Sequence, residues 1–96
     1  MADRIERIAI AGRVQGVFYR KWAQSTATSL GLRGWVRNLS DGGVEALVGG
    51  PKERIDAFAE ACRAGPPHAE VTSVERSIAD PADLPEVQGV EIADDG

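Results

Sequence analysis

The spacing of hydrophobic residues changes within the first third of the chain, and each spacing predicts a different element. Residues 5–13 alternate between apolar and other side chains, which is typical of a half-buried strand whose charged residues point outward. The period then lengthens, because Ala23, Ala27 and Leu30 recur at the spacing of one helix face. We therefore expect a strand over 5–13 and an amphipathic helix over 19–30.

Two strands joined by a tight turn are predicted next. Residues 32–39 are rich in side chains that suit a pleated surface, and residues 44–48 alternate between apolar and polar or small positions. Asp41-Gly42 between two such stretches is a strong signal for a hairpin. The sequence therefore predicts antiparallel strands over 32–39 and 44–48.

The second half of the chain predicts another helix followed by strands. Pro51 suits the first position of a helix over 51–64, and Gly65-Pro66-Pro67 ends that helix. The apolar stripe of this helix consists of Ile55, Phe58, Ala59 and Cys62. Residues 71–78 predict a fourth strand, and residues 87–92 suit a short fifth strand after a polar connection.

This order of elements is that of an α+β fold, the ferredoxin-like α/β sandwich, β-α-β-β-α-β with a short extra C-terminal strand. Right-handed crossovers place both helices on one face of a mainly antiparallel sheet. The first two strands are then expected to run parallel, with the third between them. The sequence leaves open which edge of the sheet the fifth strand joins.

A candidate anion site lies where the first strand ends and the first helix begins, at Val14-Gln15-Gly16-Val17-Phe18-Tyr19-Arg20. The N–H groups of a first helical turn lack partners within the helix, and the helix dipole adds positive charge there. Gly16 can take a positive φ and approach a ligand, and Arg20 can hold two phosphate oxygens. The alternative is that Gly16 only serves the turn and Arg20 is solvated.

Asn38 ends the second predicted strand, and parallel strands end at the same edge of a sheet. We therefore expect Arg20 and Asn38 to lie close together although they are far apart in sequence. A side-chain amide donates and accepts hydrogen bonds without titrating near neutral pH, so Asn38 can orient a water molecule. The alternative is an asparagine that only bonds to local backbone beside the turn.

Composition narrows the choice of partners. A length of 96 residues predicts a single domain over 1–96, and a net charge of −4 argues against a basic face for nucleic acid. The single Cys62 cannot form an internal disulfide, and no apolar run has the length of a signal or membrane segment. We expect a cytoplasmic protein with a small-molecule partner, no nucleic acid and no membrane.

Other reactive residues fit structural roles better than chemical ones. Asp41 is a single turn carboxylate, and Cys62 lies on the apolar stripe of the second helix. His68 is interpreted as a loop residue. No cluster of Asp, Glu and His is expected at the site, so neither a metal nor a covalent intermediate is expected.

The aromatic residues Phe18, Trp22, Trp35 and Phe58 are interpreted first as packing residues. Trp35 can instead lie on the open face of the sheet, where it either touches a ligand or pairs across strands with Leu47. A sheet with aromatic residues also suggests RNA recognition, but the aromatic motif and basic surroundings of that module are missing.

Four stretches of the sequence together resemble the small acylphosphatase family. They are Gly-Arg-Val-Gln-Gly-Val-Phe-Tyr-Arg at 12–20, Gly-Leu-Arg-Gly-Trp-Val-Arg-Asn at 31–38, Asp-Gly-Gly-Val-Glu at 41–45 and Gly-Pro-Pro-His-Ala-Glu-Val at 65–71. The resemblance extends over roughly residues 5–78 in the order and spacing of the family, which makes it more specific than any one stretch.

The resemblance implies an enzyme without a cofactor that hydrolyses acyl phosphates to a carboxylate and inorganic phosphate. We expect a monomer, because no extended apolar face remains once both helices are packed. Arg20 and Asn38 match the catalytic pair of the family, in which the asparagine orients the attacking water. The backbone expected to hold the substrate phosphate, or inorganic phosphate as a competitive ligand, is that of Gln15, Gly16, Val17, Phe18, Tyr19 and Arg20. Two features depart from the family. Tyr19 stands where phenylalanine is common, so its hydroxyl needs a partner or solvent, and residues 87–92 lack an aromatic-rich ending.

Two alternatives to the enzyme stay open. The first is a non-catalytic phosphate- or acyl-phosphate-binding or regulatory module of the same fold, like the similar domains fused within larger carbamoyl-transfer proteins. The second is a structural protein with an inactive site. The fold alone does not separate these functions, and the stand-alone length favours the enzyme.

Overall fold

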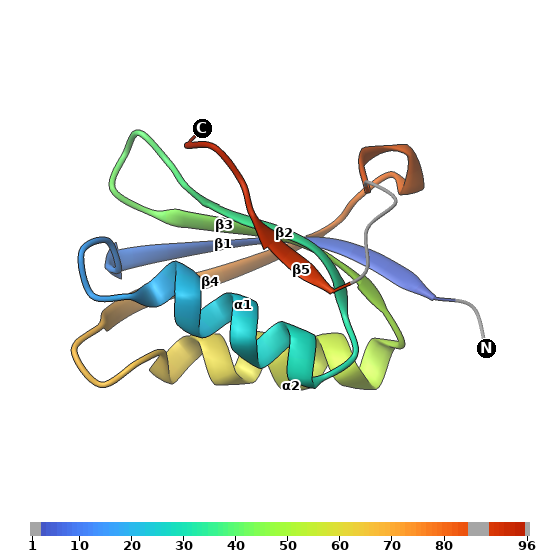
Figure 1. Ribbon diagram of the computed structural model, residues 1–96, viewed down its shortest axis with the longest axis horizontal. Coiled ribbons are helices and arrows are strands. Elements are labelled where there is room, and N and C mark those ends of the chain that lie inside the picture. The colour runs from blue at the N-terminus through green and yellow to red at the C-terminus, as the bar shows by residue number, and fades with distance from the viewer. Residues whose placement is uncertain (1–2, 85–88, 96) are drawn as a thin grey trace.

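The computed structural model describes residues 3–84 and 89–95, and it has the predicted order of elements (Figure 1). The elements of these residues are β1 (Arg4–Arg13), α1 (Tyr19–Ser29), β2 (Arg33–Asn38), β3 (Val44–Gly50), α2 (Lys52–Ala64), β4 (Glu70–Ile78), a 3-10 helix η1 (Pro81–Asp83) and β5 (Val90–Ile92). Two helices pack on one mixed sheet, which confirms the ferredoxin-like α+β fold.

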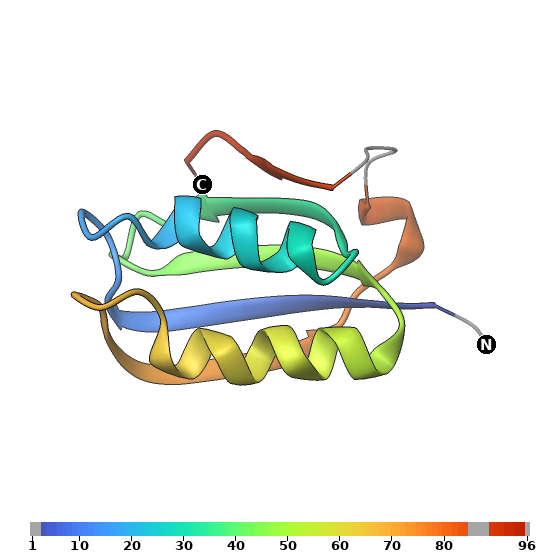
Figure 2. The same cartoon turned by 60° about the horizontal axis from the view of Figure 1, so that its bottom comes forward.

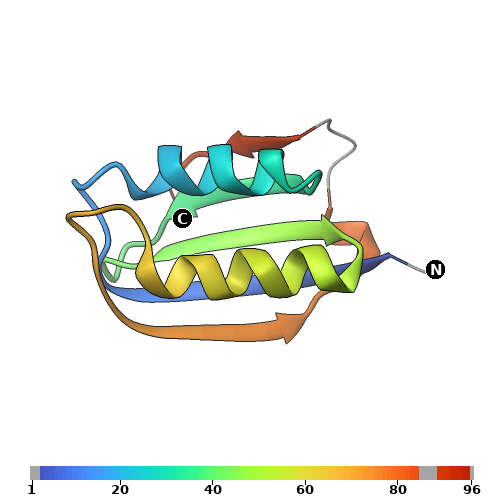
Figure 3. The same ribbon diagram turned by 90° about the horizontal axis from the view of Figure 1, so that it is seen from below.

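The strands lie in the order β4-β1-β3-β2-β5, and every neighbouring pair is antiparallel except β2 with β5. β1 and β2 therefore run parallel on either side of β3, as predicted. Both helices cover one face of the sheet (Figure 3). β5 joins the edge beside β2, with Trp35 opposite Glu91, which answers the question that the sequence left open.

Several element ends lie one or two residues from the predicted ones, and two differences concern Pro51 and the fifth strand. Pro51 has a φ of −61°, which suits a helix, but its ψ of 143° is extended, so α2 begins at Lys52 and Pro51 precedes it. The fifth strand covers only Val90–Ile92, and positions 87 and 88 of the predicted strand lie outside the described residues.

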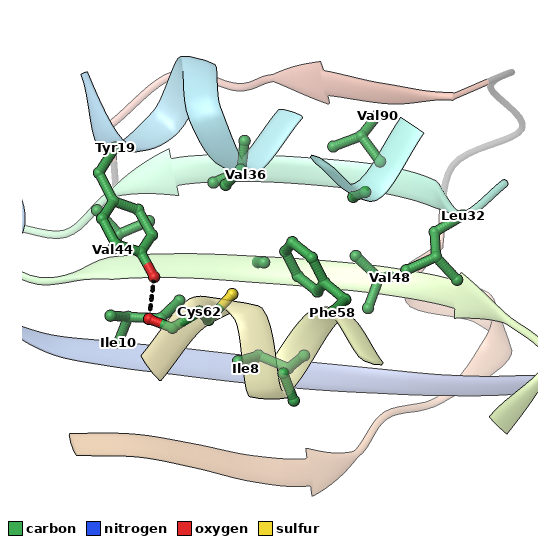
Figure 4. Close-up of a cluster of buried hydrophobic side chains, with 14 of the residues drawn as sticks. Ile8, Ile10, Tyr19, Leu32, Val36, Val44, Val48, Phe58, Cys62 and Val90 are labelled. Carbon is green, nitrogen blue, oxygen red and sulfur yellow. Dashed lines mark hydrogen bonds between the residues drawn. The ribbon is translucent and has the colours of Figure 1, made fainter. Parts of the chain in front are cut away.

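One hydrophobic core lies between the helices and the sheet (Figure 4). The predicted apolar stripe of α2 is buried there, since none of its side chains is more than 3% exposed. Ala23 and Ala27 of α1 are fully buried, and their small side chains allow this helix to pack closely on the sheet. The strands contribute Ile8, Ile10, Val36, Val44, Ala46 and Val48.

One charged residue of β1 contradicts the expectation that such residues point outward. Glu6 is 2% exposed, and its carboxylate accepts hydrogen bonds from Arg76 of β4 at 2.8 and 3.0 Å. Arg76 also donates to Asp56 of α2 at 2.7 Å. A buried carboxylate needs such partners because an unpaired buried charge is costly. The prediction failed because the partner lies 70 positions away in the sequence.

The Tyr19 hydroxyl, whose partner the sequence left open, donates a hydrogen bond of 2.6 Å to the Cys62 carbonyl (Figure 4). That carbonyl belongs to the last turn of α2, where backbone acceptors have no partner within the helix. Burial raises the pKa of Tyr19 above its ordinary value, so the hydroxyl stays protonated and keeps donating. The contact holds the start of α1, and with it Arg20, in a set position relative to α2.

Candidate active site

A cleft opens where the β1–α1 loop, the end of β2 and the end of β5 meet. It has a volume of about 330 Å³ and is lined by Val14, Gln15, Gly16, Phe18, Tyr19, Arg20, Lys21, Asn38 and Ile92. The prediction that Arg20 and Asn38 lie close together is confirmed, because both line this cleft. Its size suits a small molecule.

The topology of the sheet brings these segments together. β1, β2 and β5 all run in the same direction, because β3 is antiparallel to β1 and β2 while β5 is parallel to β2. Their C-terminal ends therefore lie at the same end of the molecule (Figure 2). α1 starts at this end, so its N-terminus lies beside the end of β2.

The loop before α1 has the geometry that an anion site requires. Gly16 has a φ of 75°, the positive value expected for it, and a Cβ there would meet nothing within 4 Å. Glycine is therefore used here for its backbone conformation. No side chain caps α1 and no acidic residue lies in its first turn, so its first N–H groups keep their positive character. A bound anion satisfies such groups.

Gln15 has a role that the sequence did not reveal. Its side-chain amide donates hydrogen bonds to the carbonyls of Leu39 and Gly43, each at 2.8 Å. These carbonyls belong to the turn that follows Asn38, so Gln15 ties the loop to that turn and sets the position of Asn38 relative to Arg20. The partners lie 24 and 28 positions away, and no local pattern identifies them.

A carboxylate of the chain itself lies beside Arg20. Nη1 of Arg20 and Oδ1 of Asp95 are 3.4 Å apart, and the two side chains are 38% and 67% exposed. The N–H of Ala93 donates to the Val36 carbonyl at 2.8 Å, which keeps the chain after β5 beside β2 and directs it toward the cleft. Exposed ion pairs contribute at most about 1 kcal/mol, so Asp95 is held only weakly beside Arg20.

The prediction that Phe18 is a packing residue is wrong. Its side chain is 83% exposed, because a left-handed backbone at this residue turns the ring away from the core. Its neighbours point inward, since Tyr19 is 1% exposed and Val17 packs against the core. Trp22 and Phe58 pack against or within the core as predicted.

Trp35 lies on the sheet face opposite the helices, because it alternates along β2 with Val36, which is buried in the core. This is one of the two positions considered for it. It is opposite Leu47 in the register of β2 and β3. The guanidinium groups of Arg37 and Arg7 lie 4.8 and 5.9 Å from its ring centre, which is the range of cation–π contacts. Trp35 therefore packs on the open face and does not line the cleft.

Asp41 and Cys62 have the structural roles expected of them. The Asp41 carboxylate accepts a hydrogen bond of 2.8 Å from the Gly43 N–H within the turn. Burial raises the pKa of the Cys62 thiol to about 12, so it is not a nucleophile at neutral pH. His68 is exposed in the loop after α2.

Within residues 3–84 and 89–95, no group of three or more His, Cys, Asp or Glu side chains could hold a metal ion. None of the helices described there is both long and apolar enough to span a membrane.

A larger hollow of about 980 Å³ lies at the opposite end of the sheet, where β1 and α2 begin. Its lining includes Asp3 and Glu53 as well as Arg4 and Lys52, so positive and negative side chains balance there. The smaller cleft is the better candidate for phosphate chemistry, because it combines Arg20 with a free helix N-terminus.

These observations define a ferredoxin-like α+β domain whose cleft is suited to a phosphate-bearing small molecule. The sequence model of the acylphosphatase family matches residues 6–91. An acylphosphatase from Anaeromyxobacter dehalogenans is 51% identical over 83 residues, which cover 85% of this chain and 89% of that protein. The chain belongs to the acylphosphatase family, and it is a hydrolase that acts on small acyl phosphates.

Solved structures agree with this assignment. The structure of an acylphosphatase from Coxiella burnetii has a TM-score of 0.86 and 31% identity, and the match covers 95% of this chain and 93% of that one. Full-length HypF in its phosphate- and nucleotide-bound form has a TM-score of 0.84 and 25% identity. That match covers 98% of this chain but only 12% of HypF.

Proposed function

We propose that Arg20 and Asn38 are the catalytic residues of this acyl phosphate hydrolase. In this proposal the substrate phosphate is held by the Arg20 guanidinium and by the backbone of Gln15, Gly16, Val17, Phe18, Tyr19 and Arg20. The observation that carries the proposal is that Arg20 and Asn38 line one cleft beside the uncapped N-terminus of α1.

Arg20 and the loop backbone supply the donors that phosphoryl transfer needs. A planar guanidinium holds two phosphate oxygens at once, and backbone N–H groups are available for the third. Charge spreads over these oxygens during transfer, so donors that are already in position stabilise the transition state. This role requires no metal ion and no covalent intermediate.

Asn38 holds the attacking water in line with the bond that breaks. The water oxygen bonds to phosphorus while the bond from phosphorus to the acyl oxygen breaks, and the carboxylate leaves with the electron pair. One water proton passes to a phosphate oxygen, because a carboxylate is a good leaving group and a strong side-chain base is not needed. The inorganic phosphate released by this reaction is also a competitive ligand of the cleft.

A second candidate is a module that binds phosphate or acyl phosphate without turnover. It is favoured by the match to a small part of HypF, a much longer protein that was solved with phosphate and nucleotide bound. The two candidates differ in turnover, because a binding module occupies the same cleft but does not release a carboxylate.

Hydrolysis of benzoyl phosphate in the presence of EDTA tests the proposal. We expect turnover well above the uncatalysed rate without added metal, with competitive inhibition by inorganic phosphate. Phosphate binding without turnover supports the binding module instead. If the protein neither binds phosphate nor turns over benzoyl phosphate, the cleft is not the functional site.

We also propose that residues 1–96 form one domain that works as a monomer in the cytoplasm, without nucleic acid or membrane. The net charge of −4 disfavours phosphate backbones and anionic surfaces. Within the described part of the chain, the strongly exposed large apolar side chains are Phe18, Ile78 and Ile92. They are too few to form the apolar centre of a stable dimer interface.

Replacing Gln15 with methionine tests whether its side chain positions the loop. We expect kcat/KM for benzoyl phosphate to fall at least about tenfold, because small displacements of reacting groups are costly. The free energy of unfolding is expected to fall by only about 1–2 kcal/mol. Both carbonyls keep another partner, since Leu39 accepts from Gly42 at 3.2 Å and Gly43 accepts from Leu39 at 2.8 Å.

The matched control for this variant is Gln24→Met on α1, where the side chain accepts only a 3.4 Å hydrogen bond from Lys21. It makes the same chemical change away from the β2–β3 turn. Steady-state kinetics and urea unfolding are measured for both variants. If Gln15→Met keeps the kcat/KM of the natural protein, its side chain does not position the site.

Replacing Asp95 with asparagine removes the carboxylate beside Arg20. We expect the inhibition constant of inorganic phosphate to fall about two- to fivefold at low salt, because an exposed ion pair of this kind is worth at most about 1 kcal/mol. The difference should shrink near 1 M salt, where the Debye length is about 3 Å.

The control is Asp94→Asn, which changes the net charge equally next to the same position. Equal effects of both variants indicate general charge repulsion and not a contact with Arg20. Weaker phosphate binding in Asp95→Asn contradicts the prediction, because it means that Asp95 holds Arg20 in its binding position.

A further inference from the structure

Phe18 has a backbone conformation that is unusual for a residue with a side chain. Among the described residues it is the single non-glycine residue with a positive φ, at 64°. Left-handed backbone is unfavourable for a residue with a Cβ, and glycine adopts it freely. Phe18 is the residue at which the loop turns into α1, and its carbonyl accepts a hydrogen bond of 3.0 Å from the Trp22 N–H. A glycine would do the same backbone task without strain.

The fold gains no packing from the Phe18 ring. The side chain is 83% exposed, the most exposed of the large apolar side chains in the described part of the chain. Val17 and Tyr19 on either side provide the contacts of this loop with the core. A strained backbone together with an exposed aromatic ring indicates a use outside the fold, since such outliers are concentrated at functional sites.

The position of the ring relative to the cleft suggests what that use is. Phe18 lines the cleft with Arg20 and Asn38, and Ile92 of β5 lines it as well with 41% of its surface exposed. When the phosphate lies against Arg20 and the loop backbone, the acyl group has to extend out of the cradle toward the rim. Phe18 and Ile92 are thus exposed apolar residues among those that line the cleft.

We infer that Phe18 is the acyl-facing residue of the site and that it favours acyl phosphates with aromatic or bulky apolar acyl groups. This inference rests on the proposed function, because it places the phosphate at Arg20. An aromatic acyl group packs on the exposed ring, and removing both surfaces from water favours the complex. A small acyl group such as acetyl does not reach enough of the ring to gain from it. The residue therefore sets specificity and takes no part in the chemistry.

The test compares benzoyl phosphate with acetyl phosphate in the natural protein, Phe18→Ala and Phe18→Tyr. We expect kcat/KM for benzoyl phosphate to fall about three- to tenfold in Phe18→Ala, the range measured for single aromatic pairs. Because the Phe18 backbone belongs to the loop proposed to hold the phosphate, the quantity compared is the ratio of the kcat/KM values for benzoyl phosphate and acetyl phosphate, in which an effect on phosphate binding cancels. Phe18→Tyr keeps an aromatic ring and should keep the preference.

Two controls distinguish an effect of the Phe18 ring on specificity from an effect of the loop backbone. Ile78→Ala removes an exposed apolar side chain, 67% exposed, from the other end of the sheet and should leave the ratio of the two kcat/KM values unchanged. Phe18→Gly removes the ring and the strain together, so we expect a lower ratio with an unfolding midpoint equal to or above that of the natural protein.

Several outcomes would overturn the inference. An unchanged ratio in Phe18→Ala shows that the ring does not meet the acyl group. An equal loss for both substrates shows that Phe18 acts through the loop position. If the natural protein hydrolyses neither substrate, the proposed function itself fails, which the natural protein alone reveals before any variant is compared.

Discussion

Replacing Arg20 with alanine is expected to lower kcat/KM for benzoyl phosphate by about 10³-fold or more, the range seen when an arginine that contacts a transferring phosphoryl group is lost. The variant loses two hydrogen bonds to phosphate oxygens and one positive charge in the cleft. Because the same contacts hold inorganic phosphate, its inhibition constant should rise strongly as well. Steady-state kinetics with and without phosphate measure both effects.

Arg20→Lys distinguishes charge from shape. Lysine keeps the positive charge but not the planar fork, so its activity should lie between those of the natural protein and Arg20→Ala. The matched control is Arg63→Ala on α2, an exposed arginine whose contact is with Glu60 at 3.4 Å. That variant makes the same change in net charge and should keep full activity. Near-normal kcat/KM in a folded Arg20→Ala contradicts the assignment.

Replacing Asn38 with alanine is expected to lower kcat by about 10²–10³-fold, the cost measured for losing one positioned side-chain amide at a reaction centre. The inhibition constant of inorganic phosphate is expected to change by less than about threefold, because Asn38 acts on the water and not on the bound phosphate. Arg20→Ala, in contrast, is expected to lose both rate and phosphate affinity. Kinetics and phosphate inhibition measured on one preparation show the difference.

The fold should survive this substitution. Asn38 pairs with Val44 in the register of β2 and β3, and alanine leaves that backbone unchanged. Ser40→Ala, in the adjacent turn, serves as the control for changes near the strand end. Equal losses of rate and phosphate affinity in Asn38→Ala indicate that Asn38 supports the cradle and does not orient water.

Periodicity predicted the elements well because local sequence determines them. The helical stripe of Ile55, Phe58, Ala59 and Cys62 is buried as expected, and the Asp41-Gly42 turn joins β2 to β3. The order of elements then determines where strands end, so the proximity of Arg20 and Asn38 followed from topology alone. These inferences need no knowledge of side-chain contacts.

The contacts that the sequence did not predict are non-local. Gln15 donates to the far side of a turn, Asp95 reaches Arg20 from the end of the chain, and Glu6 is buried against Arg76. In each case the partner lies tens of positions away and is chosen by the register of the strands. A sequence pattern indicates that a side chain can donate a hydrogen bond or carry a charge, but it does not indicate which residue is the partner.

The burial of the Phe18 side chain was wrongly predicted for a different reason. Val17, Phe18 and Tyr19 are consecutive apolar residues, so hydrophobicity alone does not indicate which of them points inward. The answer depends on a left-handed backbone at Phe18, which is a rare conformation for phenylalanine and has no sequence signal of its own. A glycine at this position would have indicated the turn.

The position of β3 between β1 and β2 has a consequence for how the protein is made. Arg20, in the helix after β1, and Asn38, at the end of β2, leave the ribosome before β3, which lies between β1 and β2 and ends at Gly50. β1 also needs β4 on its other side, and β4 ends at Ile78. A nascent chain that ends before Ile78 contains Arg20 and Asn38, but the sheet that places them beside one another is incomplete. Phosphate binding should therefore appear late and abruptly during translation, which makes it a sensitive signal of completed folding.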